Sequence, residues 1–247
     1  MTENIKISII TVVYNSVNLI ERTIKSIIQQ SYSNLEYIII DGGSFDGTLD
    51  VIKKHEKDIQ KWVSEPDNGL YDAMNKGINI ANGEYILFIN SGDKLFNNST
   101  LENIFKAPDA DIYYGDTIII NESNKELGPR RLRPPRQLSF KSLKKGMLVC
   151  HQSFIAKKEI VPPFDLRYSY SSDFDWIISI VNKSKSISNT NLIISRFLEG
   201  GQTSNNVYKG LIERFNIMKK HYGLLSAIMH NLLLIPRFFG YIFTKRI

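Results

Sequence analysis

The sequence predicts an α/β fold in which helices flank a mostly parallel sheet and a helical tail follows at the C-terminus. Two observations predict this class. Apolar runs alternate with helical patterns through residues 6–89, which is typical of a parallel sheet with helical crossovers. The strands also read as near-continuous apolar runs, as expected for strands covered on both faces. A chain of 247 residues, 43% of them hydrophobic, allows one large domain and an appendage.

The first part of the chain alternates regularly between strand and helix. Strands are predicted at 6–13, 35–40, 59–64 and 85–89, and helices at 19–30, 48–55 and 69–81. Right-handed crossovers place the ends of parallel strands at one edge of the sheet. The loops after the first, second and fourth strands should therefore lie together, and they carry Asn15, Asp41 and Asp93.

The pattern loosens after residue 93. It predicts a short helix at 99–105, strands at 111–114 and 117–120 separated by Gly115-Asp116, and a loop over the basic, proline-containing segment 129–136. A strand at 147–156, a helix at 173–181 and a strand at 192–197 follow, and the chain reads as helix from Val207 onward.

The charge distribution is uneven. The net charge is +6 and the isoelectric point is about 9.2. Lys and Arg concentrate at 129–145 and after residue 207, and such segments attract phosphates, anionic lipid or nucleic acid unless they are simply solvated surface. The single cysteine, Cys150, excludes an internal disulfide and fits a reducing compartment. The first residues show no signal-peptide pattern.

Ligands of open α/β sheets bind beyond the carboxyl ends of the strands. A dinucleotide-binding Gly-x-Gly-x-x-Gly and a phosphate-binding Gly-x-x-x-x-Gly-Lys-Ser/Thr are both absent from the sequence. Asp41 follows a strand, where a carboxylate suits recognition of a base or ribose. Asp93 stands where a carboxylate could hold a cation or a substrate, although a turn or cap residue would look the same.

Four motifs in order resemble the family-2 glycosyltransferases of the GT-A fold, most closely those that build capsule, O-antigen or exopolysaccharide. They are Thr11-Val12-Val13-Tyr14-Asn15, Asp41-Gly42-Gly43-Ser44-x-Asp46-Gly47-Thr48, Gly69-x-x-x-Ala73-Met74-Asn75-Lys76-Gly77, and Ala81-x-Gly83-Glu84-Tyr85 continuing to Asn90-Ser91-Gly92-Asp93. The resemblance implies a GT-A domain at 1–205, with a nucleotide-binding half at 1–93 and an acceptor half at 94–205. Residues 206–247 would form a basic, amphipathic helical tail.

The resemblance implies a donor site for a nucleotide-diphosphate sugar. Asp41 would bond the base, usually uracil, although it could instead cap the following turn. The remaining donor contacts carried over are Thr11, Tyr14 and Asn15 at the nucleoside and Asn75 and Lys76 near the diphosphate. Asn75 could equally be a buried helix residue.

Asp93 matches the last acid of the family's metal-binding Asp-x-Asp and would coordinate Mg²⁺ or Mn²⁺ at the donor diphosphate. Oxygen ligands suit such hard cations. The family often has further acids in this loop, whereas this sequence has Asn90 and Gly92. That departure keeps open a non-catalytic, transferase-like scaffold.

The acceptor half contains Ser172-Asp173, where the family usually has Glu-Asp. Asp173 matches the general base that removes the proton of the acceptor hydroxyl, and the alternative is a helix cap. Asp175 is the second candidate for the base.

Three further residues are weaker candidates for contacts with acceptor, sugar or phosphate. They are His151, Asp116 and Arg196, for each of which a structural role is the alternative. The segment Gly200-Gly201-x-Thr203-Ser204 reads either as a lid over the diphosphate or as a plain loop.

The predicted activity is an inverting hexosyl- or N-acetylhexosaminyl-transfer from a UDP-sugar to a saccharide acceptor, lipid-linked, in cell-surface polysaccharide biosynthesis. His230, Asn231 and Pro236 interrupt the apolar tail at 222–247, which favours an interfacial segment over a spanning helix; packing on the domain is the alternative. We therefore expect a cytoplasmic protein, peripheral on the inner face of the cell membrane, with no nucleic-acid partner. The alternative function is a polyanion- or membrane-binding module.

Overall fold

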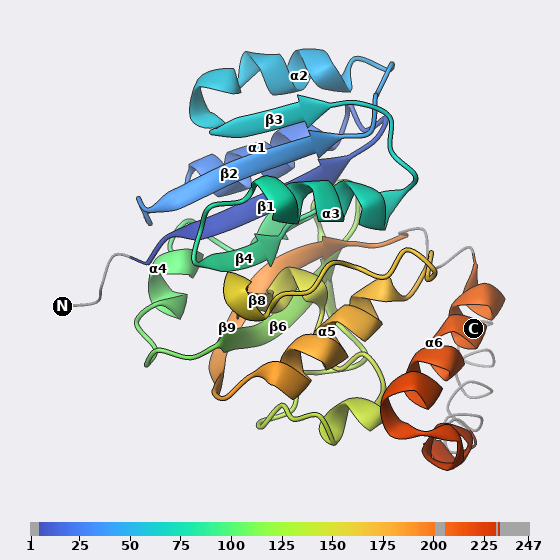
Figure 1. Ribbon diagram of the computed structural model, residues 1–247. Helices are drawn as coiled ribbons and strands as arrows, with labels where there is room; N and C mark the ends of the chain where they lie inside the picture. Colours follow the sequence, from blue (N-terminus) through green and yellow to red (C-terminus); the bar gives the residue numbers. More distant parts are fainter. Residues whose placement is uncertain (1–4, 201–205, 231, 233–247) are drawn as a thin grey trace.

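The computed structural model describes residues 5–200, 206–230 and 232, which form a twisted, mostly parallel sheet with helices on both faces (Figure 1). The described part of the chain contributes nine strands, in the order β3-β2-β1-β4-β8-β6-β9-β5, with β7 paired to β6. β8 runs antiparallel to both β4 and β6. The predicted fold class is confirmed.

The N-terminal half supplies the regular parallel part of the sheet. Its elements are β1 (Ile7–Val13), α1 (Ile20–Ile28), β2 (Leu35–Asp41), α2 (Thr48–Lys54), a 3₁₀ turn at Glu56–Asp58, β3 (Lys61–Ser64), α3 (Leu70–Ile80) and β4 (Tyr85–Phe88). Every residue of β1 is buried, which explains its unbroken apolar sequence. The predicted elements of this half are all confirmed.

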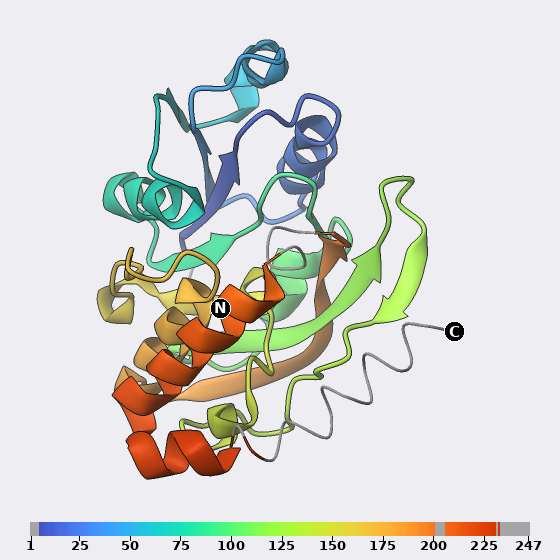
Figure 2. The same ribbon diagram turned by 90° about the vertical axis from the view of Figure 1, so that its right-hand side faces the viewer.

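The C-terminal half extends the sheet with longer strands. Its elements are β5 (Lys94–Leu95), α4 (Thr100–Ile104), β6 (Ile112–Ile120), β7 (Glu126–Pro129), β8 (Phe154–Lys157), α5 (Ser172–Lys183), β9 (Ile187–Leu198) and α6 (Val207–Tyr222), with 3₁₀ turns at Ser142–Lys145, His151–Ser153 and Lys158–Ile160. The hairpin of β6 and β7 extends to one side of the sheet (Figure 2).

Each face of the sheet has its own core, because successive strand residues point to opposite faces. Ile10 and Val12 of β1 pack with Met74 of α3 and with α5, whose Trp176 is 1% exposed. Ile9 and Val13 pack on the other face with α1, α2 and α4. The two cores hold the strand ends in fixed positions.

Two predictions of local structure were wrong, and the strand β7 was not predicted. β6 continues through Gly115 as one strand, with a shift of its register against β9 there. Glycine is required at this position because a Cβ would approach the Leu192 carbonyl oxygen to 2.4 Å. The strand predicted at 147–156 is confined to β8, and a 3₁₀ turn precedes it. The loop predicted at 129–136 is confirmed from residue 130 onward, and it follows β7.

The C-terminal helix is interrupted. α6 ends at Tyr222, because Gly223 adopts a φ of 82°, and residues 224–230 are helical again. Residues 231 and 233–247, which carry most of the predicted interfacial segment, lie outside the described residues. Among the residues that are described, none of the helices combines the length and apolarity needed to cross a membrane.

Candidate active site

The loops at the carboxyl ends of β1, β2 and β4 meet, as predicted. The Gly42 amide donates to the Val13 carbonyl at 2.9 Å, and the Asn15 amide donates to Ser44 Oγ at 2.8 Å. The Ser91 amide donates to the Val12 carbonyl at 3.2 Å. These bonds place the three polar loops at one edge of the sheet.

A cleft of about 490 Å³ opens at this edge. Its lining comes from the loop after β1, from 67–73 at the start of α3, from the loop after β4, from 151–152, from α5 and from 197–200. This volume lies within the range of small-molecule sites. Four of the predicted site residues line it: Tyr14, Asp93, His151 and Asp173.

Asp93 is held rigidly in the wall of the cleft, with only 4% of the residue exposed. One carboxylate oxygen accepts the Leu198 amide at 2.8 Å, and the other accepts Gln152 Nε2 at 2.6 Å. Burial raises the pKa of Asp93 to about 6, although both hydrogen bonds act to lower it. A bound cation would favour the ionised form.

Asp173 lies in the first turn of α5, where two side chains hold its carboxylate. His151 Nδ1 is 3.2 Å from Oδ2, and the Tyr71 hydroxyl donates to Oδ1 at 3.3 Å. Burial acts to raise the pKa of Asp173, but the hydrogen bond and charge of His151 outweigh it, so the pKa lies below its usual value. Ser171 holds the N-cap position without a side-chain cap bond, and Asp173 Oδ1 also accepts the Phe174 amide of the first turn at 2.9 Å, so the general-base role stays a prediction.

The His151-Gln152 dipeptide connects the two acids. His151 faces Asp173 with Nδ1 and lies 3.3 Å from Asn90 Nδ2 with Nε2, while Gln152 donates to Asp93. Neither Gln152 nor Tyr71 was predicted from the sequence to have a role in the site. The available signal for Gln152 was its place beside His151 in a polar break between apolar residues, whereas α3 gave no signal that singled out Tyr71.

The oxygen atoms around Asp93 fit Mg²⁺ or Mn²⁺. Within the described part of the chain, Asn90 Oδ1 is buried without a hydrogen-bond partner, and it lines the same cleft. Each oxygen of Asp93 accepts one hydrogen bond, which leaves it a lone pair. No group of three or more His, Cys, Asp or Glu side chains suitable for a metal occurs among residues 5–200, 206–230 and 232. Asn90 and Asp93 would therefore hold the cation together with the donor's own phosphate oxygens.

Of the residues predicted to contact the nucleoside, Tyr14 lines the cleft and Asp41 does not. Tyr14 is 59% exposed, and its ring meets that of Phe45 edge-on, with 6.3 Å between the centroids. Asp41 is fully buried and accepts hydrogen bonds from the Ser44 amide, Ser44 Oγ and Ser64 Oγ. It thus organises the loop after β2; a direct contact with the base stays a prediction.

Thr11 and Asn15 use their side chains within the fold. Thr11 Oγ1 donates to the Ile89 carbonyl at 2.7 Å inside the sheet, and the Phe45 amide donates to Asn15 Oδ1 at 3.1 Å. Asn15 has a φ of 45°, which turns the chain sharply out of β1. Contacts of these two side chains with a nucleoside also stay predictions.

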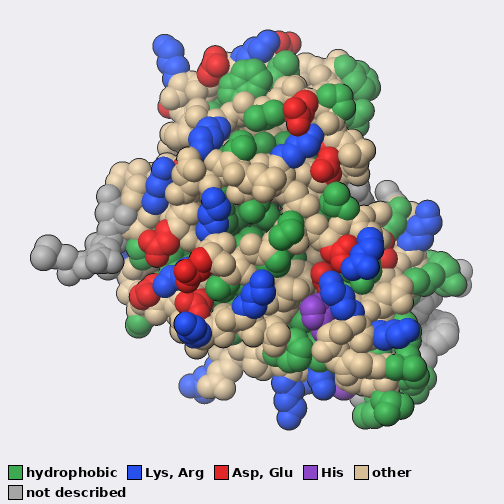
Figure 3. Space-filling model, viewed as in Figure 1, with side chains coloured by type: hydrophobic (Ala, Val, Ile, Leu, Met, Phe, Trp, Pro, Cys, Tyr) green, Lys and Arg blue, Asp and Glu red, His purple; other side chains and the backbone are tan. Residues whose placement is uncertain are grey.

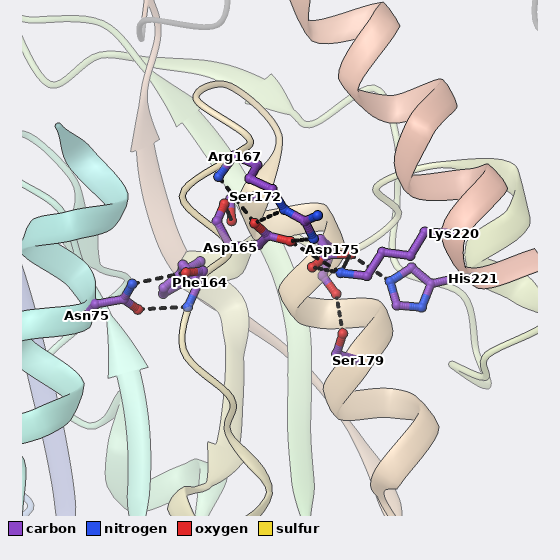
Figure 4. Close-up of polar contacts among 9 residues, drawn as sticks. All are labelled: Asn75, Phe164, Asp165, Arg167, Ser172, Asp175, Ser179, Lys220 and His221. Atoms are coloured by element: carbon purple, nitrogen blue, oxygen red, sulfur yellow. Dashed lines mark hydrogen bonds and ion pairs between the residues drawn. The ribbon is translucent and has the colours of Figure 1, made fainter. Parts of the chain in front are cut away.

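Asn75 and Lys76 lie outside the lining of the cleft. Asn75 forms a two-point bond with the backbone of Phe164, accepting its amide at 2.7 Å and donating to its carbonyl at 3.0 Å (Figure 4). Lys76 pairs with Glu65 at 2.8 Å and donates to the Pro66 carbonyl. The part of α3 that lines the cleft is its first turn, nearer the strand ends, which includes Tyr71.

Asp116 and Arg196 also lie outside the lining. Asp116, on β6, forms an ion pair with Arg133 and accepts the Thr117 amide. Arg196, on β9, pairs with Glu126 at 2.8 Å and lies over the ring of Phe96. The predicted lid at 200–204 is described only as far as Gly200, which lines the cleft, and the rest lies outside the described residues.

Residues 8–161 match the family described as Glycosyl transferase family 2. The chain belongs to this family. The resemblance noted in the sequence is thereby confirmed; the match covers most of the predicted nucleotide-binding half and the first part of the predicted acceptor half, and it ends before Asp173.

One curated relative and two solved structures extend the comparison. The chain is 26% identical over 217 residues to the Escherichia coli UDP-Glc:alpha-D-GlcNAc-diphosphoundecaprenol beta-1,3-glucosyltransferase WfaP, covering 86% of this chain and 85% of WfaP. The structure of Staphylococcus aureus TarS 1–349 with UDP-GlcNAc has a TM-score of 0.69 at 16% identity, covering 87% of this chain and 65% of that chain, just under two thirds. Mannosyltransferase PcManGT from Pyrobaculum calidifontis, in complex with GDP-Man and Mn²⁺, has a TM-score of 0.62 at 14% identity, and the alignment covers 94% of this chain and 75% of PcManGT. These structural likenesses confirm the GT-A fold.

Proposed function

We propose that this glycosyltransferase moves a sugar from a UDP-sugar to a lipid-linked saccharide, with inversion, in cell-surface polysaccharide biosynthesis. One observation carries the proposal: Asp93 and Asp173 line one cleft and are joined through His151-Gln152. WfaP, which is named for UDP-Glc, and TarS, whose structure contains UDP-GlcNAc, support a UDP-sugar, and the name of WfaP supports a lipid-linked acceptor. Those names leave open whether a hexose or an N-acetylhexosamine is transferred.

In this mechanism the residues act from two walls of the cleft. Asp173, ionised and held by His151 and Tyr71, accepts the proton of the acceptor hydroxyl as that oxygen attacks the anomeric carbon. Asp93 and Asn90 would hold a Mg²⁺ or Mn²⁺ ion, which would neutralise charge on the donor diphosphate as it leaves. Direct displacement from the face opposite the diphosphate inverts the anomeric configuration.

The test is transfer by the purified chain from UDP-sugars to a synthetic diphospholipid saccharide with Mn²⁺. We expect Asp173→Asn and Asp93→Asn each to lower kcat by about 100-fold or more, as removal of a general base or of diphosphate stabilisation does. The matched control is Asp58→Asn, at an exposed aspartate of the 3₁₀ turn after α2, with unchanged kcat.

Two results would contradict the proposal. Turnover of Asp173→Asn near that of the wild type would exclude Asp173 as the general base. A product whose anomeric configuration is retained, as seen by NMR, would exclude direct displacement. Binding of UDP-sugars without transfer to any acceptor would favour the non-catalytic scaffold.

A further inference from the structure

Exposed apolar side chains concentrate on one surface of the molecule. Of the twelve large hydrophobic side chains exposed in the described part of the chain, eight lie between Tyr208 and Leu232. The most exposed are Leu225 at 79%, Tyr208 at 76%, Met229 at 61% and Leu232 at 58%. Figure 3 shows hydrophobic side chains gathered over α6 and the segment after it. We call the exposed apolar side chains of 208–232 the outer face.

The opposite side of α6 is fastened to the domain. Glu213 accepts the amides of Ser169 at 2.8 Å and Tyr170 at 2.9 Å. Lys220 and His221 pair with the buried Asp175 of α5 at 2.9 and 2.7 Å (Figure 4). The part of the outer face that lies on α6 therefore has a defined position and cannot be buried by a small rotation of this helix.

The outer face is also cationic. Glu213 is the only acid between residues 206 and 232, and its carboxylate faces the domain, where it accepts the two backbone amides named above. Lys209 and Lys219 are exposed beside the apolar side chains. The basic segment 129–145 adjoins the end of α6, where Lys144 lies over the ring of Tyr222 and the Tyr222 hydroxyl donates to the Phe140 carbonyl. Apolar surface with flanking cations and no free acid complements an anionic lipid surface.

The outer face and the cleft lie on the same side of the molecule. β1, β2 and β3 point to the right in Figure 1, so their carboxyl ends lie on the right-hand side of the molecule. That side faces the viewer in Figure 2, where α6 lies across it. The first turn of α6 contacts the chain two residues before Asp173: Ser171 Oγ donates to the Gly210 carbonyl at 3.3 Å. A flat surface against α6 would therefore border the Asp173 side of the cleft.

We propose that the outer face docks on an anionic lipid bilayer and so presents a membrane-embedded acceptor to the cleft. The part about the acceptor rests on the proposed function, whereas lipid docking does not. A second copy of this chain fits the same face poorly, because Lys209 and Lys219 would meet like charges without an acid to pair them.

The test is co-sedimentation of the full chain with vesicles of phosphatidylcholine, with and without phosphatidylglycerol. We expect at least tenfold tighter binding to the anionic vesicles, weakening as salt is raised. The double substitution Leu225→Ser with Met229→Ser should lower this binding at least tenfold. The matched control is Leu127→Ser with Leu166→Ser, two exposed leucines outside the outer face. Equal thermal unfolding midpoints of the two variants exclude a folding defect.

Activity provides the second readout. The outer-face variant should transfer sugar to a water-soluble, short-chain acceptor as fast as the wild type, but at least tenfold more slowly to a long-chain acceptor in vesicles. Unchanged vesicle binding by this variant would overturn the proposal. So would a wild-type dimer that becomes monomeric in the variant, or loss of binding only on deletion of 233–247. Absent transfer with intact vesicle binding would contradict the proposed function alone.

Discussion

At the scale of single residues, the site depends on hydrogen bonds that orient two carboxylates. Asp173 and Asp93 have different surroundings: His151 and Tyr71 hold the first, and Gln152 and a backbone amide hold the second. The pKa of Asp173 lies below its usual value, and that of Asp93 is raised to about 6. Asp173 is therefore ionised and able to accept a proton, whereas binding of a cation beside Asp93 would favour the ionised form of that carboxyl.

Tyr71 offers the cleanest residue-scale test. Tyr71→Phe removes the hydroxyl that donates to Asp173 but keeps the ring, whose centroid lies 5.3 Å from that of Phe164. We expect kcat to fall about tenfold, because the base loses one of its orienting bonds, while KM for the donor stays unchanged. Steady-state kinetics at fixed acceptor concentration measure both.

The control for this variant is Tyr113→Phe, which also loses a buried hydroxyl bond, to the Pro108 carbonyl, outside the cleft. It should keep the wild-type kcat. A positioning role for Tyr71 fails if both variants have the same kcat, or if Tyr71→Phe changes only the donor KM.

At the scale of elements, α3 connects the two halves of the domain. Asn75 fastens the backbone of Phe164, and the ring of Phe164 stacks on that of Trp176 of α5, with 4.9 Å between the centroids. α5 in turn carries Asp173 and pairs with α6 through Asp175. The position of the base is thus set by α3, by the segment at 164–171 and by α6, which lie far apart in the sequence.

Asn75→Ala tests this connection. Loss of two buried hydrogen bonds should lower the free energy of unfolding by about 1–3 kcal/mol, measured by urea denaturation. Asn75→Asp should be destabilising as well, because its second oxygen would face the Phe164 carbonyl. Asn79→Ala, one turn along α3 and exposed, is the control with little change. If Asn75 instead contacts the donor, as the sequence suggested, the donor KM will rise while stability stays constant.

At the scale of the whole molecule, a buried carboxylate ties the parallel strands together. Glu36 of β2 accepts Ser8 Oγ of β1 at 2.6 Å and the Asn82 amide before β4 at 2.7 Å, and it pairs with Lys61 of β3 at 3.0 Å. Burial acts to raise the pKa of Glu36, but these partners outweigh it and lower the pKa to about 2. The ionised form is therefore the one that stabilises the sheet.

The sign of the pH dependence follows from this lowered pKa. The stabilisation by Glu36 is complete above its usual pKa of 4.5 and is lost as the pH falls toward 2. Glu36→Gln should cost about 2–3 kcal/mol of unfolding free energy at pH 7, and this difference from the wild type should shrink by pH 3. Urea denaturation at both pH values measures it. Glu159→Gln, at an exposed glutamate, should cost little at either pH, and a cost for Glu36→Gln that is equal at both would contradict the assignment.

Much of the fold could be predicted from local sequence. The elements of the N-terminal half were found because each strand is a short apolar run between polar turns, and because helical spacing is visible over three turns. The long strand through Gly115 and the strand β7 were missed. A glycine inside a strand, and a short edge strand with a charged residue, both look like loop sequence unless the neighbouring strand is known.

The sequence by itself determined the fold class and the family, and it singled out two acids that line the cleft, because these depend on periodicity and on motifs within short stretches. Only the tertiary structure decided which polar residues meet. It joined Tyr71, His151 and Asp173 across three separate segments and directed Asn75, Asp116 and Arg196 to partners outside the cleft. The physical reason is that a side chain's partner depends on how distant elements pack, and spacing along the chain does not contain that information.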